Sequence, residues 1–316
     1  MSSITMKNDP CMHRADICGP LDVGDVRRLI PTGPVPHADV RLALSKALTS
    51  SAFDRSTDAP SAVSSIVYGI RTVAKVQHRE HERLSSALWF EKLRSSIGIP
   101  APALLDAGIV DTPSGARWWL ILERIHGSED HQTRPERQQA VGAQLRIWHE
   151  SAPPHGLRLD DPGGLGVLLG TPRFVVPDAY LAISHALAEV CEGQLMTSIH
   201  GDMAVGHNTI FREDDLVAIL DPGAVHVAPP MLDLAWCLAV DLPHGAYSDP
   251  LLDGYGRDAL DFDTLNELLP HMLLRRLVDA LIAGNERDSR WLTNELHRRA
   301  PNLLDLVGLP EGIHAD

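Results

Sequence analysis

The feature that most constrains the fold is a change in predicted secondary structure near residues 126–128. Before this point, short apolar runs bounded by Gly and Pro predict strands, whereas longer amphipathic segments after it predict helices. Strands grouped ahead of helices favour an α+β fold over an alternating α/β fold. The helices are predicted over 135–150, 178–192, 231–240, 264–283 and 285–299. The predicted organisation is a polar leader (1–35), a β-rich lobe (36–125) and a mainly helical lobe (126–316).

Two pairs of strands are predicted in the β-rich lobe. Residues 66–68 and 72–76 form a hairpin with Gly69 near its turn. Residues 103–110 and 118–123 flank a turn over 112–115. The other elements predicted in this lobe are a short helix over 40–48, a loop over 50–65 and a charged helix over 81–94.

The chain is acidic, with 28 Lys and Arg residues against 42 Asp and Glu residues and a net charge of −14. Nucleic acids and anionic membrane surfaces are themselves negative, which argues against either as the main partner. The charge suits a cationic small molecule, and it equally suits an acidic surface that serves solubility alone.

Nothing in the sequence predicts secretion or membrane insertion. Residues 1–20 lack the apolar core of a signal peptide, and no window approaches the length of an apolar transmembrane helix. The cysteines are scattered without a C-x-x-C pair, which favours a reducing compartment. We therefore expect a cytoplasmic protein.

The segment from Ser198 to Phe211 carries the strongest functional signal. Asp202 follows His200-Gly201, Asn208 comes six residues after Asp202, and an apolar run over 216–220 then leads into Asp221. In phosphoryl-transfer sites one carboxylate takes the proton of an attacking hydroxyl, while an amide and a second carboxylate hold Mg²⁺ against the nucleotide phosphates. The pattern therefore indicates Asp202 as the base and Asn208 and Asp221 as metal ligands.

A zinc site is a weaker interpretation of the sixteen histidines. His149-Glu150 begins an H-E-x-x-H pattern, but Pro153 stands where the second histidine is needed. His78 and His81 have no third ligand at a recognisable spacing.

With these pieces in order, the chain resembles the aminoglycoside phosphotransferase and choline-kinase group over about residues 61–236. The resemblance implies a bilobal protein-kinase-like fold. It also implies transfer of a phosphoryl group from ATP or GTP, with Mg²⁺, to the hydroxyl of a small acceptor.

The resemblance assigns the nucleotide-binding residues to the β-rich lobe. Lys75, in the strand Val73–Val76, would reach the nucleotide phosphates, and Ser64 and Ser65 would belong to the loop that covers them. Backbone groups near Glu123 and Ile125 would pair with the purine edge, which leaves ATP and GTP undistinguished.

The same resemblance implies three supporting roles. His200 would brace the loop that carries Asp202, and Asp233 would open a helix and hold that loop in place. A helix glutamate would pair with Lys75, and the candidates are Glu80, Glu82 and Glu91.

The chain departs from the pattern at one position. The usual spacing from the base to the metal-binding asparagine is five residues, which here places His207 at that position and Asn208 one residue later. Either the loop contains one extra residue and Asn208 binds the metal, or His207 replaces the asparagine. Mg²⁺ prefers oxygen ligands to imidazole, which favours Asn208.

The leading functional hypothesis is phosphorylation of a small cationic acceptor, such as an aminoglycoside or another antibiotic, as a resistance activity. An acidic group of residues in the helical lobe would lie near the acceptor or form a solvated face: Asp253, Asp258, Asp261, Asp263 and Glu267. One alternative is a kinase of a metabolite, such as an amino alcohol, a sugar or a nucleoside. Another is a pseudokinase that binds nucleotide without transferring phosphate, suggested by the spacing of Asp202 and Asn208.

Overall fold

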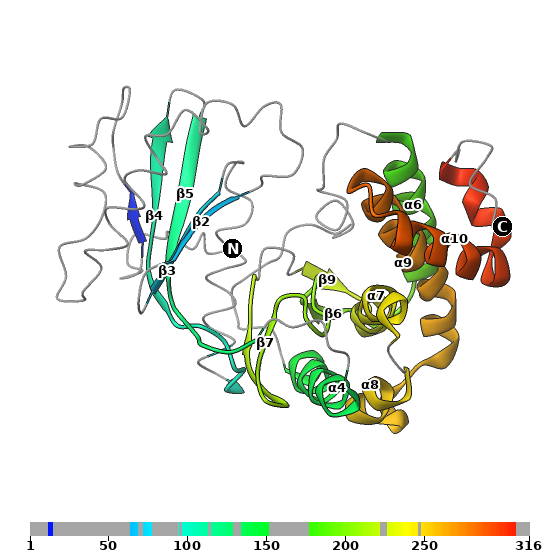
Figure 1. The fold of residues 1–316 in the computed structure, drawn as a ribbon, viewed down its shortest axis with the longest axis horizontal. Helices are drawn as coiled ribbons and strands as arrows, with labels where there is room; N and C mark the ends of the chain where they lie inside the picture. Colours follow the sequence, from blue (N-terminus) through cyan, green and yellow to red (C-terminus); the bar gives the residue numbers. More distant parts are fainter. Residues whose placement is uncertain are drawn as a thin grey trace. The chain divides into compact units, whose positions relative to one another are not determined.

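The computed structural model describes residues 12–14, 64–68, 72–77, 94, 97–112, 115–128, 134–151, 177–221, 226–245 and 248–307. The chain divides into two compact units, residues 1–91 with 101–126 and residues 92–100 with 127–316. The described strands of the first unit form one sheet. The second unit contains the helices from α4 onwards and the short strands β6 to β9 (Figure 1).

The first unit is built on a five-stranded sheet with the strand order β1-β4-β5-β3-β2. Its strands are β1 (Met12–Arg14), β2 (Ser64–Tyr68), β3 (Thr72–Gln77), β4 (Leu104–Thr112) and β5 (Gly115–Glu123). Neighbouring strands are antiparallel except β1 and β4, which are parallel. Both predicted strand pairs are confirmed, and pairing of β3 with β5 joins them.

Two features of this sheet differ from the sequence prediction. β1 lies in the segment predicted as a polar leader, where it pairs with β4 through backbone groups that any sequence can supply. Ser64 and Ser65, predicted in a covering loop, are instead the first residues of β2 and pair with Gln77 and Val76. The predicted helix over 40–48, the loop over 50–63 and nearly all of the helix over 81–94 lie outside the described residues.

The second unit is mainly helical. Its helices are α4 (Pro135–Glu150), α6 (Pro177–Cys191), α7 (Pro230–Asp241), α8 (Ser248–Tyr255), α9 (Phe262–Ile282) and α10 (Glu286–Arg299). Its short strands are β6 (Thr197–Ile199), β7 (Thr209–Arg212), β8 (Asp215–Ile219) and β9 (His226–Ala228). Three 3₁₀ turns are described as well: η3 (Leu242–His244), η4 (Arg257–Ala259) and η5 (Pro301–Val307).

The five helices predicted in this part of the chain are confirmed to within two residues at each end. Local end signals explain this agreement: Pro135 starts α4, while the side chains of Asp261 and Asn285 cap α9 and α10 by accepting from backbone amides. α8 was not predicted from the sequence, because at eight residues it is too short for a clear helical period. Mixed helices and strands agree with the predicted α+β class, and the bilobal arrangement stays a prediction.

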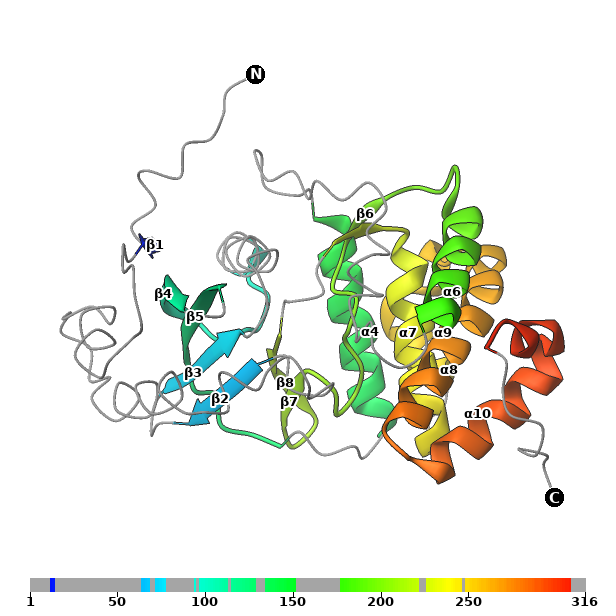
Figure 2. The same ribbon diagram turned by 90° about the horizontal axis from the view of Figure 1, so that it is seen from above.

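α7 forms the centre of the second unit, because every residue from Met231 to Asp241 is buried. It packs against α9, α4 and α8 (Figure 2). α4 and α8 also approach each other closely: a Cβ atom placed on Gly142 would lie 2.0 Å from the carbonyl oxygen of Leu251. No described helix is both long and apolar enough to cross a membrane.

Candidate active site

The candidate site lies where β6 ends and the β7–β8 hairpin opens. The amide of Leu220 donates to the carbonyl oxygen of Asn208 at 2.7 Å, extending the ladder between β7 and β8 by one step. Asn208 and Asp221 therefore lie at the same open end of this hairpin. Both have left-handed backbones, with φ of 59° and 48°, a conformation that Asn and Asp adopt more readily than most residues.

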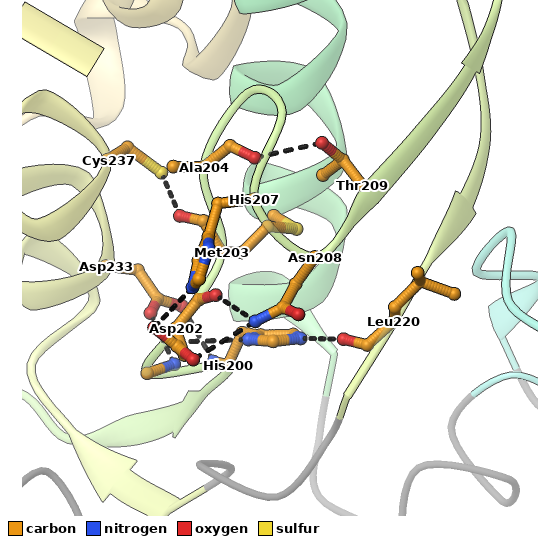
Figure 3. Close-up of polar contacts among 11 residues, drawn as sticks. His200, Asp202, Met203, Ala204, His207, Asn208, Thr209, Leu220, Asp233 and Cys237 are labelled. Carbon is orange, nitrogen blue, oxygen red and sulfur yellow. Dashed lines mark hydrogen bonds and ion pairs between the residues drawn. The ribbon is translucent and has the colours of Figure 1, made fainter. Parts of the chain in front are cut away.

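Asp202 is contacted by two consecutive residues (Figure 3). His207 places Nε2 3.1 Å from Oδ1 of Asp202, and Asn208 donates from Nδ2 to Oδ2 at 3.1 Å. The same Asn208 nitrogen donates to the backbone oxygen of Asp202 at 2.8 Å. The side chain of Asp202 is 28% exposed, so its carboxylate is held by protein groups yet remains reachable from solvent.

Asp202 and His207 form an ion pair. Burial acts to raise the pKa of Asp202, but the hydrogen bond and charge of His207, with the charge of Arg275, outweigh it and lower that pKa. Burial acts to lower the pKa of His207, but the hydrogen bond to Asp202 and its negative charge outweigh it and raise that pKa. Asp202 is therefore a carboxylate at neutral pH, as a general base requires.

His200 braces the loop, as predicted. Its ring is fully buried, and Nε2 lies 2.9 Å from the carbonyl oxygen of Leu220. The amide of Asp202 donates to Nδ1 at 3.2 Å. With these partners Nδ1 accepts a hydrogen bond and Nε2 donates one. His200 thereby ties the backbone of Asp202 to the strand end that precedes Asp221.

Asp233 holds the start of the same loop, which also confirms its predicted structural role. Its carboxylate oxygens accept from the amides of His200 and Gly201 at 2.8 and 2.7 Å. Its side chain is 1% exposed. Burial acts to raise the pKa of Asp233, but the hydrogen bond and charge of His149 outweigh it and keep that pKa low.

His149 is a supporting residue whose role the sequence analysis did not find. Its Nε2 lies 3.0 Å from Oδ2 of Asp233, and its Nδ1 lies 3.0 Å from the hydroxyl oxygen of Tyr255. Its contacts thus connect α4, α7 and α8 beneath the site. Among the described residues, no three His, Cys, Asp or Glu side chains gather to hold a metal.

A tight turn lies between Asp202 and the consecutive residues His207 and Asn208. Ala204 and His207 exchange two backbone hydrogen bonds of 3.0 Å around Val205 and Gly206. Gly206 has φ of 71°, as the third position of a type II turn requires. The turn returns the chain toward Asp202, and the left-handed Asn208 then allows His207 and Asn208 both to reach that residue.

The donor set fits a hard cation better through Asn208 than through His207. Both partners of the Asn208 amide nitrogen are acceptors, which fixes the orientation of the amide and directs its oxygen away from Asp202. The imidazole Nε2 of His207 is engaged by Asp202. An amide oxygen from Asn208 and a carboxylate from Asp221, with phosphate oxygens and water, are ligands typical of Mg²⁺.

The predicted nucleotide-binding residues lie in the first unit. Lys75 is in β3, pairs with Ile66 and Leu120, and is 9% exposed. Glu123 ends β5, and its amide already donates to Ala103 at 2.9 Å, which makes that amide unavailable to a purine. Ile125 is half-buried in the coil that follows. The three candidate partners of Lys75, Glu80, Glu82 and Glu91, lie outside the described residues.

Arg275 is a second residue that sequence reasoning missed. Its guanidinium stacks on the ring of Trp236 at 4.3 Å, the residue is 7% exposed, and its charge helps to lower the pKa of Asp202. It lies in the middle of α9, where an arginine in a helical pattern is normally read as a surface residue.

Solved structures that are similar to this chain include aminoglycoside phosphotransferases. One, a thermostable mutant of aminoglycoside phosphotransferase APH(4)-Ia in a ternary complex with ADP and hygromycin B, has a TM-score of 0.51 at 14% identity. The match covers 79% of this chain and 95% of that one. The chain has the aminoglycoside phosphotransferase fold.

A second phosphotransferase supports the same assignment of the fold. Aminoglycoside-3'-phosphotransferase of type VIII has a TM-score of 0.50 at 15% identity, over 71% of this chain and 97% of that one. No protein-family model matches the chain, and no curated protein matches it by sequence. The resemblance predicted from the motifs is therefore confirmed at the level of the fold.

Proposed function

We propose that this protein is a small-molecule O-phosphotransferase that moves the γ-phosphoryl group of ATP or GTP, with Mg²⁺, to a hydroxyl of its acceptor. The ionised, partly exposed carboxylate of Asp202 carries this proposal, together with the side chains of Asn208 and Asp221 at the open end of the β7–β8 hairpin. The aminoglycoside phosphotransferase fold supports it.

Asp202 acts as the general base. Each carboxylate oxygen accepts one N–H, from His207 or from Asn208, and keeps lone-pair capacity for the acceptor hydroxyl. As the hydroxyl oxygen bonds to the γ-phosphorus, the bond from that phosphorus to the β–γ bridging oxygen breaks, and the hydroxyl proton passes to Asp202. The products are the phosphorylated acceptor and the nucleoside diphosphate.

Asn208 and Asp221 would hold the metal, which when bound neutralises charge on the phosphate oxygens. The resemblance assigns the phosphate contact of the first unit to Lys75, with Ser64 and Ser65 near the phosphates. For the purine it assigns backbone groups near Glu123 and Ile125, of which the Glu123 amide is already used within the sheet.

A cationic acceptor is proposed on the basis of charge, because the net charge of −14 attracts cations over the distances at which substrates approach. We propose an aminoglycoside or another cationic antibiotic, phosphorylated in the cytoplasm as a means of resistance. A neutral metabolite, such as a sugar or a nucleoside, is the competing acceptor class.

Transfer assays test the reaction and the acceptor class together. Mg²⁺-dependent transfer from ATP and from GTP is measured for aminoglycosides, peptide antibiotics, amino alcohols, sugars and nucleosides. Asp202→Asn is expected to reduce kcat by about 10²- to 10⁴-fold with nucleotide affinity unchanged. Nucleotide binding without transfer to any acceptor would favour the pseudokinase, and transfer to a metabolite alone would refute the antibiotic acceptor.

The metal assignment has its own test. Asn208→Ala is expected to raise the Mg²⁺ concentration for half-maximal rate at least tenfold, whereas His207→Ala should reduce kcat with a smaller change in that concentration. The reverse ranking would assign the metal to His207.

A further inference from the structure

α7 follows the loop that carries Asp202, here called the catalytic loop and defined as residues 200–206. Asp233, Cys237 and Asp241 lie four residues apart and so form one stripe along a single face of α7. Together these side chains contact four backbone groups of the loop. The stripe spans about 12 Å of helix, from the 1.5 Å rise per residue.

The contacts follow the loop in sequence order. Asp233 accepts from the amides of His200 and Gly201, as described above. Cys237 donates from Sγ to the carbonyl oxygen of Met203 at 2.7 Å (Figure 3). Burial and the neighbouring carboxyl groups of Asp241 and Asp233 raise the pKa of Cys237, which keeps it a thiol and a donor.

Asp241 makes the last contact of the stripe, where its Oδ2 accepts from the amide of Val205 at 3.3 Å. The other backbone amides of the turn are satisfied locally. Those of Ala204 and His207 donate to each other's carbonyl oxygens, and the amide of Gly206 donates to the Thr209 hydroxyl at 3.1 Å. Val205 is thus the residue of the turn whose amide depends on α7.

The burial of Asp241 is costly without a compensating role. The residue is 1% exposed, and its Oδ1 has no hydrogen-bond partner in the described part of the protein. Its immediate neighbours in α7 are mostly apolar, and a leucine or alanine would fill the same helix face without desolvating a carboxyl group. The contact that sets Asp241 apart from such a residue is the one to Val205.

We propose that Asp241 is a positioning residue for the phosphoryl transfer proposed above, acting by fixing the Val205–Gly206 turn that places His207 and Asn208 against Asp202. It touches no substrate. Its effect passes through the Val205 amide to the turn, and from the turn to the two side chains that orient the Asp202 carboxylate and supply the metal ligand. Placement errors of about 1 Å near reacting groups can cost about 10²-fold in rate.

Three variants test the proposal. Asp241→Ala removes the acceptor and leaves the Val205 amide buried without a partner. Asp241→Asn keeps an acceptor oxygen at nearly the same volume. Val240→Ala is the matched control, since it truncates a buried neighbour in α7 to the same residue, and the valine side chain has no group that could hydrogen-bond to the catalytic loop.

Two readouts are taken on the full-length protein. One is hydrogen–deuterium exchange of the amides of residues 203–207. The other is the phosphotransfer rate, measured as kcat, KM for nucleotide and half-saturating Mg²⁺. For Asp241→Ala we expect exchange at least tenfold faster, kcat at least tenfold lower, half-saturating Mg²⁺ raised, and nucleotide affinity without Mg²⁺ unchanged. Asp241→Asn should restore slow exchange and most of the rate.

The comparison with Val240→Ala separates positioning from general loosening of α7. Equal changes in exchange and kcat for Asp241→Ala and Val240→Ala would overturn the proposal. A failure of Asp241→Asn to restore slow exchange or the transfer rate would overturn it as well. The exchange measurement does not depend on activity. Selective loosening of residues 203–207 in a protein whose wild type transfers no phosphate would refute the proposed function and leave the assignment of Asp241 to the turn intact.

Discussion

The stability of Asp241→Asn relative to the wild type is expected to rise with pH. Burial raises the pKa of Asp241 from the ordinary value of 3.8 to about 8, against the opposing effects of the Val205 amide and the charge of His207. Between these two values the folded protein holds the Asp241 proton and the unfolded chain does not. Raising the pH over this range therefore favours the unfolded state.

The magnitude follows from the difference of one bound proton. The free energy of unfolding of the wild type falls by about 1.4 kcal/mol per pH unit from this group alone, or about 3 kcal/mol between pH 5 and pH 7.5. Asparagine does not ionise, so the variant lacks this loss. Other titrating groups are shared by both proteins and cancel in the difference. Any effect of the asparagine amide on stability that does not depend on pH shifts the difference in unfolding free energy by a constant. It leaves the change of that difference with pH unaltered.

The assay is urea unfolding of wild type and Asp241→Asn at pH 5, 6, 7 and 7.5, followed by circular dichroism at 222 nm. The described helices from α4 to α10 belong to the second unit, so this signal reports mainly on the unit that contains Asp241. A stability difference that is flat across this range would mean that Asp241 is ionised in the folded protein, and would refute the reasoning.

Three further predictions concern the packing and the loop. Gly142→Ala should destabilise the second unit by about 1–3 kcal/mol in thermal or urea unfolding, because the new Cβ would lie 2.0 Å from the Leu251 carbonyl oxygen; an unchanged stability would show that α4 and α8 are further apart. Asp233→Ala should lower the free energy of unfolding by about 3–5 kcal/mol and abolish phosphoryl transfer, since it leaves the His200 and Gly201 amides and His149 without their acceptor. Asp233→Asn should retain part of the stability and part of the transfer activity. Equal losses in the two variants would contradict this account. His207→Gln should lower stability more at pH 6 than at pH 9. A histidine whose folded-state pKa is raised contributes most to stability below its ordinary pKa of 6.5 and loses that contribution as the pH rises through the folded-state pKa. Urea unfolding at both pH values checks this, and an effect independent of pH would argue against the ion pair with Asp202.

Much of the fold could be predicted because its signals are local. The ends of the long helices follow from residues that cap or start them, such as Pro135 in α4 and Asp261 in α9. The hairpin of β2 and β3 follows from two apolar runs around a short turn. β1 and α8 were missed since one is held by backbone pairing alone and the other is short.

The candidate site was predictable to the extent that its residues are close in sequence. Asp202, His200 and Asn208 lie within nine residues, and the structure brings all three together. The role of Asp233 was also anticipated, from the motif that opens its helix. Lys75, Ser64 and Ser65 keep their proposed roles as predictions, with the two serines now placed in a strand.

The order of helices and strands could be predicted from the sequence, and so could the candidate base and metal ligands, because helical period, turn residues and motif spacing are properties of neighbouring positions. Only the tertiary structure decided how those residues are held. It turned the chain at Val205–Gly206 so that His207 and Asn208 both reach Asp202. It also buried Asp241 and Arg275 near that loop. Burial and neighbouring charges set the pKa values of Asp241 and Asp202. Both depend on contacts between segments that are far apart in the chain.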